Sequence, residues 1–381
     1  MPLGRPEGLL SPSSGSAEET RVGERLRRFP VALLLMLTAL VCLGEVVLYS
    51  AVGGMEQLDA TLRQGVRFIV SATVMMVVSV TDGRLFRRYA YVFYGGVLFL
   101  LVLVFLAGTV GMGARRWLSL GFMNLQPSEP MKLAIILALA RYFHDRAVSK
   151  GIGVRDFLVA GVMIAMPMGL ILKQPDLGTA ILLLGVGGTV VFVAGLSWKA
   201  ILGLVAMGGS VLPVAWNFLH DYQKKRIFTL FDPEADPLGA GYHIIQSKIA
   251  VGSGGLLGKG FMAGSQSRLE FLPERHTDFI FSVLAEEWGF AGAMVLMTLY
   301  ALVIVRGLVI AASAKDRFGL LVASGVTALF AIQVVVNMGM VIGLLPVVGI
   351  PLPLISYGGS SMVTVMLAMG LLAHVSVQST K

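Results

Sequence analysis

Residues 30–52 read PVALLLMLTALVCLGEVVLYSAV, a run that is apolar over almost its whole length. Such a run matches the roughly 20 residues that an α-helix needs to cross about 30 Å of hydrocarbon. It is too long for the core of a signal peptide, and no small-residue cleavage site follows it, so it predicts a helix that stays in the membrane. Three basic residues precede it, Arg25, Arg27 and Arg28. By the positive-inside rule they place the N-terminus in the cytoplasm.

The composition of the whole chain fits the same environment. Apolar residues make up 56% of the 381 residues and charged residues only 14%, against about 25% charged in soluble domains. The net charge of +8 comes mainly from Lys and Arg between apolar runs, which is typical of topology signals rather than of nucleic-acid binding. The single cysteine, Cys42, excludes an internal disulfide framework and a CxxC site.

Further apolar runs predict an all-α integral membrane fold of about ten transmembrane helices. The predicted spans are about 30–52, 65–80, 89–108, 131–143, 157–173, 178–196, 200–219, 279–305, 319–341 and 359–377. The runs are continuous, whereas barrel strands alternate, so a barrel is excluded. An even number of spans returns the C-terminus to the cytoplasm. Basic loops at 81–88, 144–156 and 313–317 agree with this orientation.

These spans define one polytopic membrane domain over 30–377. We expect a disordered cytoplasmic tail over 1–29, which is rich in Gly, Ser, Pro and charge, and a short cytoplasmic tail over 378–381. The stretch 219–278, between the seventh and eighth spans, is the large extracytoplasmic loop. Its Lys and Arg residues offer an electrostatic surface for an anionic ligand. Within it, GSGGLLGKG at 252–260 does not fit a phosphate-binding loop, and we interpret it as a flexible or re-entrant segment lying on the bilayer.

The most informative stretch is LEFLPERHTDFIF at 269–281. It concentrates ionisable residues immediately before an apolar span: Glu270, Glu274, Arg275, His276 and Asp278. Asp278 would lie where water gives way to hydrocarbon, and an ionisable group at that depth should face a polar cavity or a partner. The alternative is a helix cap, in which Thr277 or Asp278 binds free amides at the start of the eighth span. No HxxxH or HExxH pattern indicates zinc.

Three other stretches carry polar groups on the same predicted side. In GARRWLSLGFMNLQPSEPMK at 113–132, Glu129 and Lys132 are three residues apart and can pair on a helix. One alternative is that Trp117 is an interfacial anchor and the Glu129–Lys132 pair is a surface salt bridge. The other is an anion clamp that includes Arg116, since Arg offers a planar fork to phosphate. In QPDLG at 174–178, a turn explains Pro175 and Gly178, and Asp176 could equally be a helix cap. In ISYGGSS at 355–361, free amides would favour a phosphate oxygen, or the glycines only allow close helix packing.

Together these stretches resemble the SEDS family of cell-wall proteins, which comprises the RodA, FtsW and SpoVE types. The motifs are QPSE followed by Lys132, QPDLG at 174–178, LPERHTDFIF at 272–281 and GLLPVVGIPLPLISYGGSS at 343–361. The ERHTDFIF and NMGMVIGLLP stretches are more similar to RodA, the elongation type, than to FtsW, the division type. The resemblance covers about 30–377.

The resemblance implies a peptidoglycan glycosyltransferase that polymerises lipid II for cell elongation and shape. It also implies a location in the bacterial cytoplasmic (inner) membrane, beside a class B penicillin-binding transpeptidase and other elongation-complex proteins. The family's catalytic Asp falls on Asp278. The candidate substrate-binding residues are Arg116, Trp117, Glu129, Lys132, Gln174, Asp176, Glu274, Arg275, His276, Thr277, Ser356, Tyr357 and Gly358. No cofactor is firmly implied, although a divalent cation, Mg²⁺ or Mn²⁺, near Glu129 and Asp278 would suit pyrophosphate and carboxylate oxygens.

One position departs from the family pattern: Pro130 stands where the family has an apolar residue, beside Glu129. Proline is tolerated in a first helical turn. Two other classes of function fit most of the same features, a lipid II flippase and a non-catalytic scaffold of the wall-synthesis complex. The charged motifs gather on one side of the membrane, which favours surface chemistry over a transport path. From the sequence we expect Lys132→Ala to impair lipid II processing more than folding.

Overall fold

The computed structural model describes most of the chain. The described residues are 23–25, 27–54, 58–111, 114–119, 124–146, 152–197, 202–203, 206, 210, 217, 221–235, 239–268 and 274–379. Most of the predicted span at 200–219 and most of the predicted tail at 1–29 lie outside these residues.

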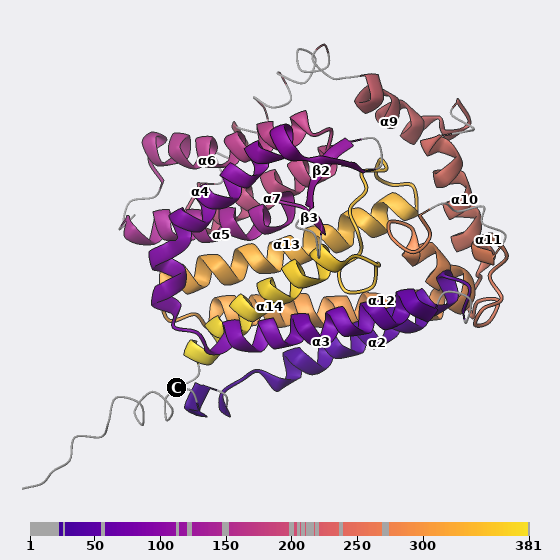
Figure 1. The fold of residues 1–381 in the computed structure, drawn as a ribbon, viewed down its shortest axis with the longest axis horizontal. Coiled ribbons are helices and arrows are strands. Elements are labelled where there is room, and N and C mark those ends of the chain that lie inside the picture. The colour runs from indigo at the N-terminus through magenta and orange to yellow at the C-terminus, as the bar shows by residue number, and fades with distance from the viewer. Residues whose placement is uncertain are drawn as a thin grey trace, which may run out of the picture.

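Long helices dominate the described part of the chain (Figure 1). They are α2 (Val31–Ala51), α3 (Leu58–Val80), α4 (Gly83–Ala107), α5 (Ser128–Asp145), α6 (Val154–Lys173), α7 (Leu177–Val193), α12 (Ile280–Ala312), α13 (Arg317–Val341) and α14 (Gly359–Ser379). Each coincides with a predicted span, and within the described residues seven are long and apolar enough to cross a membrane. The all-α membrane fold is therefore confirmed. Helix α14 continues through Ser379 and so includes the start of the tail predicted at 378–381.

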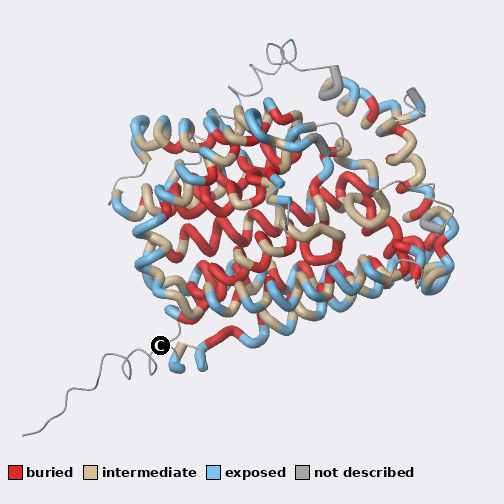
Figure 2. Tube along the Cα trace, viewed as in Figure 1, coloured by how far each residue is buried: buried red, intermediate tan, exposed pale blue. Residues whose placement is uncertain are grey.

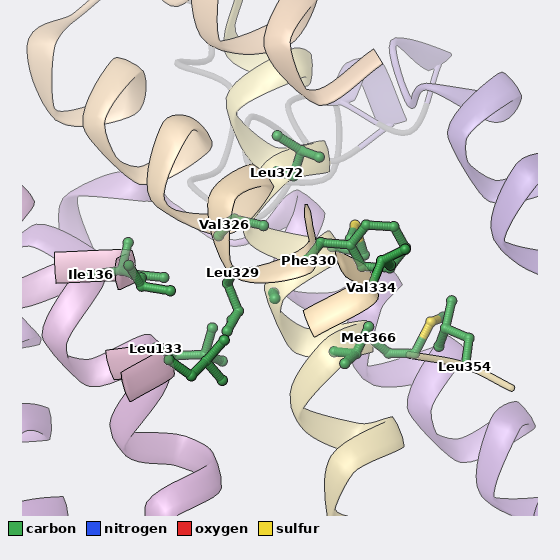
Figure 3. Close-up of a cluster of buried hydrophobic side chains, with 14 of the residues drawn as sticks. Leu133, Ile136, Val326, Leu329, Phe330, Val334, Leu354, Met366 and Leu372 are labelled. Carbon is green, nitrogen blue, oxygen red and sulfur yellow. The ribbon is translucent and has the colours of Figure 1, made fainter. Parts of the chain in front are cut away.

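The core lies around α13, which packs against α5, α7, α12 and α14. Figure 2 shows burial concentrated along these central helices and exposed residues along the outer ones. In the core, Leu133 and Ile136 of α5 lie on the side of α13 that carries Leu329 and Val326, whereas Phe330 points away from α5 (Figure 3). Outer helices such as α4 and α6 expose large apolar side chains. A lipid environment makes that exposure favourable, because hydrocarbon solvates those side chains.

Smaller elements lie at the ends of the long helices. Between α4 and α5 the chain forms an antiparallel sheet with strand order β1-β2-β3, which was not expected from the sequence. Its strands are β1 (Thr109–Gly111), β2 (Ala114–Ser119) and β3 (Asn124–Leu125). The predicted large loop contains α9 (Asp221–Phe231), η2 (Pro233–Ala235), α10 (Ala240–Ser253) and α11 (Ser265–Arg268). Helices α9 to α11 lie at one end of the bundle, and the C-terminus lies at the other (Figure 1).

The glycine-rich stretch 252–260 packs against a kink in α12. Its interpretation as a flexible or re-entrant segment lying on the bilayer stays a prediction. The kink is at Gly289, whose φ of 64° is a left-handed conformation that glycine adopts at little cost. Backbone amides of Lys259 and Gly260 donate to the carbonyls of Glu286 and Glu287 at 3.0 Å. The Lys259 ammonium also pairs with the Glu286 carboxylate at 2.7 Å. These contacts hold the loop close to the helix backbone.

Candidate functional site

Asp278 lies in a turn that immediately precedes α12. The backbone amides of Thr277 and Phe279 donate to the carbonyl of Glu274 at 3.1 and 3.3 Å. The backbone carbonyl of Asp278 accepts a hydrogen bond from Nδ2 of Asn337 at 2.9 Å, which ties the turn to α13. The N-cap position of α12 is Phe279, and no side chain caps it. The helix-cap alternative for this cluster is therefore wrong.

The surroundings of the Asp278 carboxylate raise its pKa above the ordinary value for aspartate. Burial raises its pKa to about 6, and the nearby Glu274 carboxylate adds to the increase because two like charges resist ionising together. The Arg226 guanidinium of α9 acts in the opposite direction, and Asp176 adds a smaller increase. Within the described residues, this carboxylate forms no hydrogen bond or ion pair. The site therefore holds a carboxylate that can change protonation state near neutral pH.

The segment between α13 and α14 wraps around the Asp278 turn. The hydroxyl of Ser356 donates to the carbonyl of Thr277 at 2.6 Å and accepts from the amide of Leu352 at 2.8 Å. The amide of Tyr357 donates to the carbonyl of His276 at 2.9 Å, and the rings of these two residues are 6.1 Å apart. Ser356 thus works as a bridge between two backbone segments. The sequence motifs around 276 and 357, about eighty residues apart, meet in one place.

The Asp278 carboxylate lies close to the backbone of Gly349, which has no side chain. A Cβ added at Gly349 would lie 3.4 Å from Oδ2 of Asp278, and the φ of Gly349 is +71°. A side chain there would be strained by the backbone conformation and would contact Oδ2 of Asp278.

We therefore expect Gly349→Ala to lower activity strongly, by tenfold or more, through strain of about 1–2 kcal/mol and restricted access to Asp278. The measurement is the rate of glycan polymerisation by the purified variant. Gly254→Ala is not a useful control because its Cβ would clash with the Ala285 carbonyl. Gly161→Ala, which meets nothing within 4 Å, is the matched control and should retain full activity. Equal activity of both variants would contradict the placement of the Asp278 carboxylate.

Glu129 and Lys132 form the ion pair that their spacing predicts. Oε1 of Glu129 and Nζ of Lys132 are 2.7 Å apart, and the side chains are only 7% and 2% exposed. The other carboxylate oxygen, Oε2, is buried and has no hydrogen-bond partner within the described residues. Pro130 lies in the first turn of α5, where a missing amide hydrogen costs nothing. The alternative of a surface salt bridge is wrong, because the pair is buried.

Arg116 and Asp176 brace the turn between α6 and α7. The guanidinium of Arg116 donates from Nε to the carbonyl of Gln174 at 2.9 Å and from an Nη to that of Pro175 at 2.6 Å. Gln174 donates to the carbonyl of Leu101 at 3.1 Å. Asp176 is the N-cap of α7, accepting from the amide and hydroxyl of Thr179 at 3.0 and 2.9 Å. Part of the predicted anion clamp is thus engaged with backbone.

The structure does not join all predicted site residues through direct contacts. Glu274, His276, Thr277, Ser356 and Tyr357 surround the Asp278 turn, and Asp176 is close enough to affect its pKa. Gly358 follows Tyr357 and accepts the amide of Met362 through its carbonyl. Arg275 donates to the carbonyl of Ala51 at 2.7 Å. Trp117 is a partly buried residue of β2. Neither Glu129 nor Lys132 bonds to Asp278 within the described residues.

Two further groups at this site escaped the sequence analysis. Asn337 joins the Asp278 turn to the carbonyl of Ile350 at 2.8 Å, and Arg226 is the cation that most affects Asp278. Asn337 could have been found from the sequence, because its side-chain amide lies inside the apolar run 319–341 and a buried polar group in a membrane span needs a partner. Arg226 is one of several basic residues in the large loop, and its position in the sequence does not indicate that it lies near Asp278.

The side chains at the site limit how a divalent cation could be held. Within the described residues, no group of three or more His, Cys, Asp or Glu could hold a metal ion. A cation bound by substrate pyrophosphate needs only one or two carboxylates from protein, and Asp278 or the unpartnered Oε2 of Glu129 fits that need. A cavity of about 540 Å³ lies at the opposite end of the bundle, by Arg84 and His374, and contains none of the candidate residues.

Comparisons with known proteins agree with this arrangement. The FtsW/RodA/SpoVE family model, described as cell cycle protein, matches residues 27–381. The peptidoglycan glycosyltransferase MrdB of Escherichia coli (strain K12) is 46% identical over 344 residues, which cover 90% of this chain and 92% of MrdB. A solved structure from work on polymerization and crosslinking by a peptidoglycan synthase complex is 35% identical, with a TM-score of 0.80, and covers 93% of this chain and 99% of that one. The crystal structure of RodA from Thermus thermophilus is 32% identical, with a TM-score of 0.70, and covers 93% and 98%. The chain therefore belongs to the FtsW/RodA/SpoVE family of membrane proteins.

Proposed function

We propose that this chain is a peptidoglycan glycosyltransferase that polymerises lipid II into glycan strands, with Asp278 as the general base. The observation that carries the proposal is the Asp278 carboxylate, which has a pKa of about 6 and lies against Gly349. A base poised near the operating pH can accept a proton in the transition state. The activity of the 46% identical relative, a peptidoglycan glycosyltransferase, supports the same reaction class.

In this reaction the 4-hydroxyl of one disaccharide attacks the anomeric carbon of another. Asp278 takes the hydroxyl proton as the new carbon–oxygen bond forms. The bond between the anomeric carbon and the pyrophosphate breaks on the opposite face, so the configuration inverts and undecaprenyl pyrophosphate leaves with the bonding electrons. Pyrophosphate leaves without a proton, so one positioned carboxylate suffices where a glycosidase needs two.

The negative charge of the leaving group needs cationic groups at the membrane surface. Arg226 is near Asp278, whereas Lys132 is already paired with Glu129. A divalent cation, when bound, would neutralise pyrophosphate charge, with Asp278 or Glu129 as its protein ligand. Arg116 has donors left beyond the two that hold the turn at Gln174 and Pro175.

The same proposal covers location and partners. Basic residues before α2, at the start of α4 and between α5 and α6 support both termini in the cytoplasm, with the Asp278 end of the bundle outside. A class B penicillin-binding transpeptidase is the proposed partner, supported by the likeness to a structure of a peptidoglycan synthase complex. The greater similarity to RodA motifs favours the elongation complex.

Incubation of the purified chain with lipid II in detergent tests this function, with and without the transpeptidase. Glycan polymer is the expected product. A flippase or a scaffold would leave lipid II unchanged in this assay, because neither forms a glycosidic bond. Absence of polymer in the presence of the partner would therefore reject the transferase.

The raised pKa of Asp278 predicts the pH dependence of that activity. The base acts only when ionised, so kcat/KM should fall as pH falls through about 6, with roughly tenfold loss per pH unit below it. A carboxylate with an ordinary pKa would keep the rate constant to about pH 4. The measurement is the initial rate of polymerisation from pH 4.5 to 8. An acid limb centred near pH 4 would contradict the burial of Asp278.

A further inference from the structure

Helix α3 carries apolar side chains on its outer face and polar side chains on its inner face. The outer face exposes large apolar side chains such as Leu62, Val66 and Ile69, as a lipid-facing helix should. The inner face carries polar residues at positions 61, 64, 67 and 71, which the three- and four-residue spacing places on one side of a helix. That side packs against α14. A polar stripe buried in a membrane protein calls for partners.

Arg67 of this stripe lies at the start of α14. Its guanidinium carbon is 4.9 Å from the centroid of the Tyr357 ring, and its Nε is 3.1 Å from where a Cβ on Gly359 would be. Gly359 is the first residue of α14, and the first turn of that helix contains no acidic residue. The guanidinium therefore faces the positive end of a helix, an arrangement that costs free energy unless an anion lies between them.

The described part of the protein supplies no such anion. No carboxylate within the described residues forms an ion pair with Arg67, and its buried Nη1 has no hydrogen-bond partner there. Gln64, one turn earlier and only 2% exposed, donates from Nε2 to the carbonyl of Ser356 at 3.1 Å, while its Oε1 is buried without a partner. Leaving buried polar groups unpaired is unfavourable, because their lost hydration is not replaced. Two such groups, one helical turn apart on α3, call for a partner that the described residues do not supply.

We propose that Arg67 and the first turn of α14 bind the pyrophosphate of the polyprenyl-linked sugar. This inference rests on the proposed function. A guanidinium fork and free helix amides both match phosphate oxygens, and two negative phosphates would offset both positive groups. Arg67 lies two residues inside the predicted span 65–80, near the headgroup level where a lipid-linked pyrophosphate lies. Tyr357 connects Arg67 to the Asp278 turn through its contacts with His276.

Binding of two probes that differ only in phosphate tests the proposal. Farnesyl pyrophosphate carries the diphosphate on a short polyprenyl chain, and farnesol carries none. Titration calorimetry in detergent, on full-length protein carrying Asp278→Asn, measures both affinities without turnover. Arg67→Gln should weaken farnesyl pyrophosphate binding by about 10- to 100-fold, since a charged hydrogen bond contributes about 1.5–3 kcal/mol. Farnesol binding should not change.

Arg63→Gln is the matched control. Arg63 lies one turn earlier on α3 and is exposed; within the described residues its polar contacts are with Asp59, an ion pair at 3.8 Å and a hydrogen bond at 3.1 Å. The substitution Arg63→Gln removes the same charge as Arg67→Gln and should leave the affinities for farnesyl pyrophosphate and for farnesol unchanged. Arg67→Lys keeps the charge but loses the fork, so its affinity should lie between those of wild type and Arg67→Gln.

Three results would overturn the proposal. The first is unchanged farnesyl pyrophosphate affinity in Arg67→Gln, and the second is an equal loss for farnesol, which would mean that Arg67 only holds Tyr357 in place. The third is no measurable pyrophosphate binding by the protein with Arg67 intact. The proposed function fails separately, if the unsubstituted protein makes no polymer or if Asp278→Asn keeps its rate, because neither result depends on these affinities.

Discussion

Asp278→Asn is expected to reduce glycan polymerisation by about 10²–10⁴-fold, the contribution of a positioned general base. Asparagine matches the shape of the side chain but cannot accept the proton of the attacking hydroxyl. Lipid II binding should persist, because the cationic groups around the site are untouched. The measurement is single-turnover polymerisation with excess enzyme, which isolates the chemical step from product release.

The folded state of this variant should be no less stable than that of the wild type. The raised pKa of Asp278 means that the fold disfavours its charged form, so a neutral side chain removes a cost at pH 7. Asp232→Asn, at an exposed carboxylate just after α9, is the matched control and should polymerise normally. Polymerisation by Asp278→Asn at the wild-type rate would remove the base from the mechanism.

Lys132→Ala is expected to destabilise the folded protein severely. Its ammonium is 2% exposed and pairs with Glu129 at 2.7 Å. Removing one member of a buried pair leaves the other charge uncompensated, which costs about 3–5 kcal/mol. The structure thus reverses the expectation from sequence, that processing would suffer more than folding. Thermal unfolding in detergent, followed by fluorescence or light scattering, measures the loss.

A double variant distinguishes the effect of an uncompensated Glu129 charge on stability from the effect of losing the Lys132 side chain itself. Lys132→Met with Glu129→Gln removes both charges, so it should recover much of the stability lost in Lys132→Ala. Arg63→Ala breaks an exposed pair on α3 and should cost less than about 1 kcal/mol. A Lys132→Ala protein that unfolds like the wild type yet makes no polymer would restore the original expectation and give Lys132 a direct role in binding.

Much of the fold could be predicted from the sequence. The lengths of apolar runs predict membrane helices because a helix alone satisfies its own backbone in hydrocarbon, and the described helices coincide with those runs. The sheet between α4 and α5 escaped prediction, since its strands are short and lack alternating apolar residues. The kink at Gly289 also escaped, because it depends on a distant glycine-rich loop packing against α12.

The sequence by itself determined the family, the membrane fold and the position of Asp278 at the start of a span, because these depend on local runs and motifs. The tertiary structure alone decided which polar groups have partners. It shows that Ser356 bridges two backbone segments, that Arg116 holds a turn and that Arg67 faces a helix start without a counterion. Whether a charge is buried, paired or open to a substrate depends on contacts between segments far apart in the chain, and residue spacing does not encode those contacts.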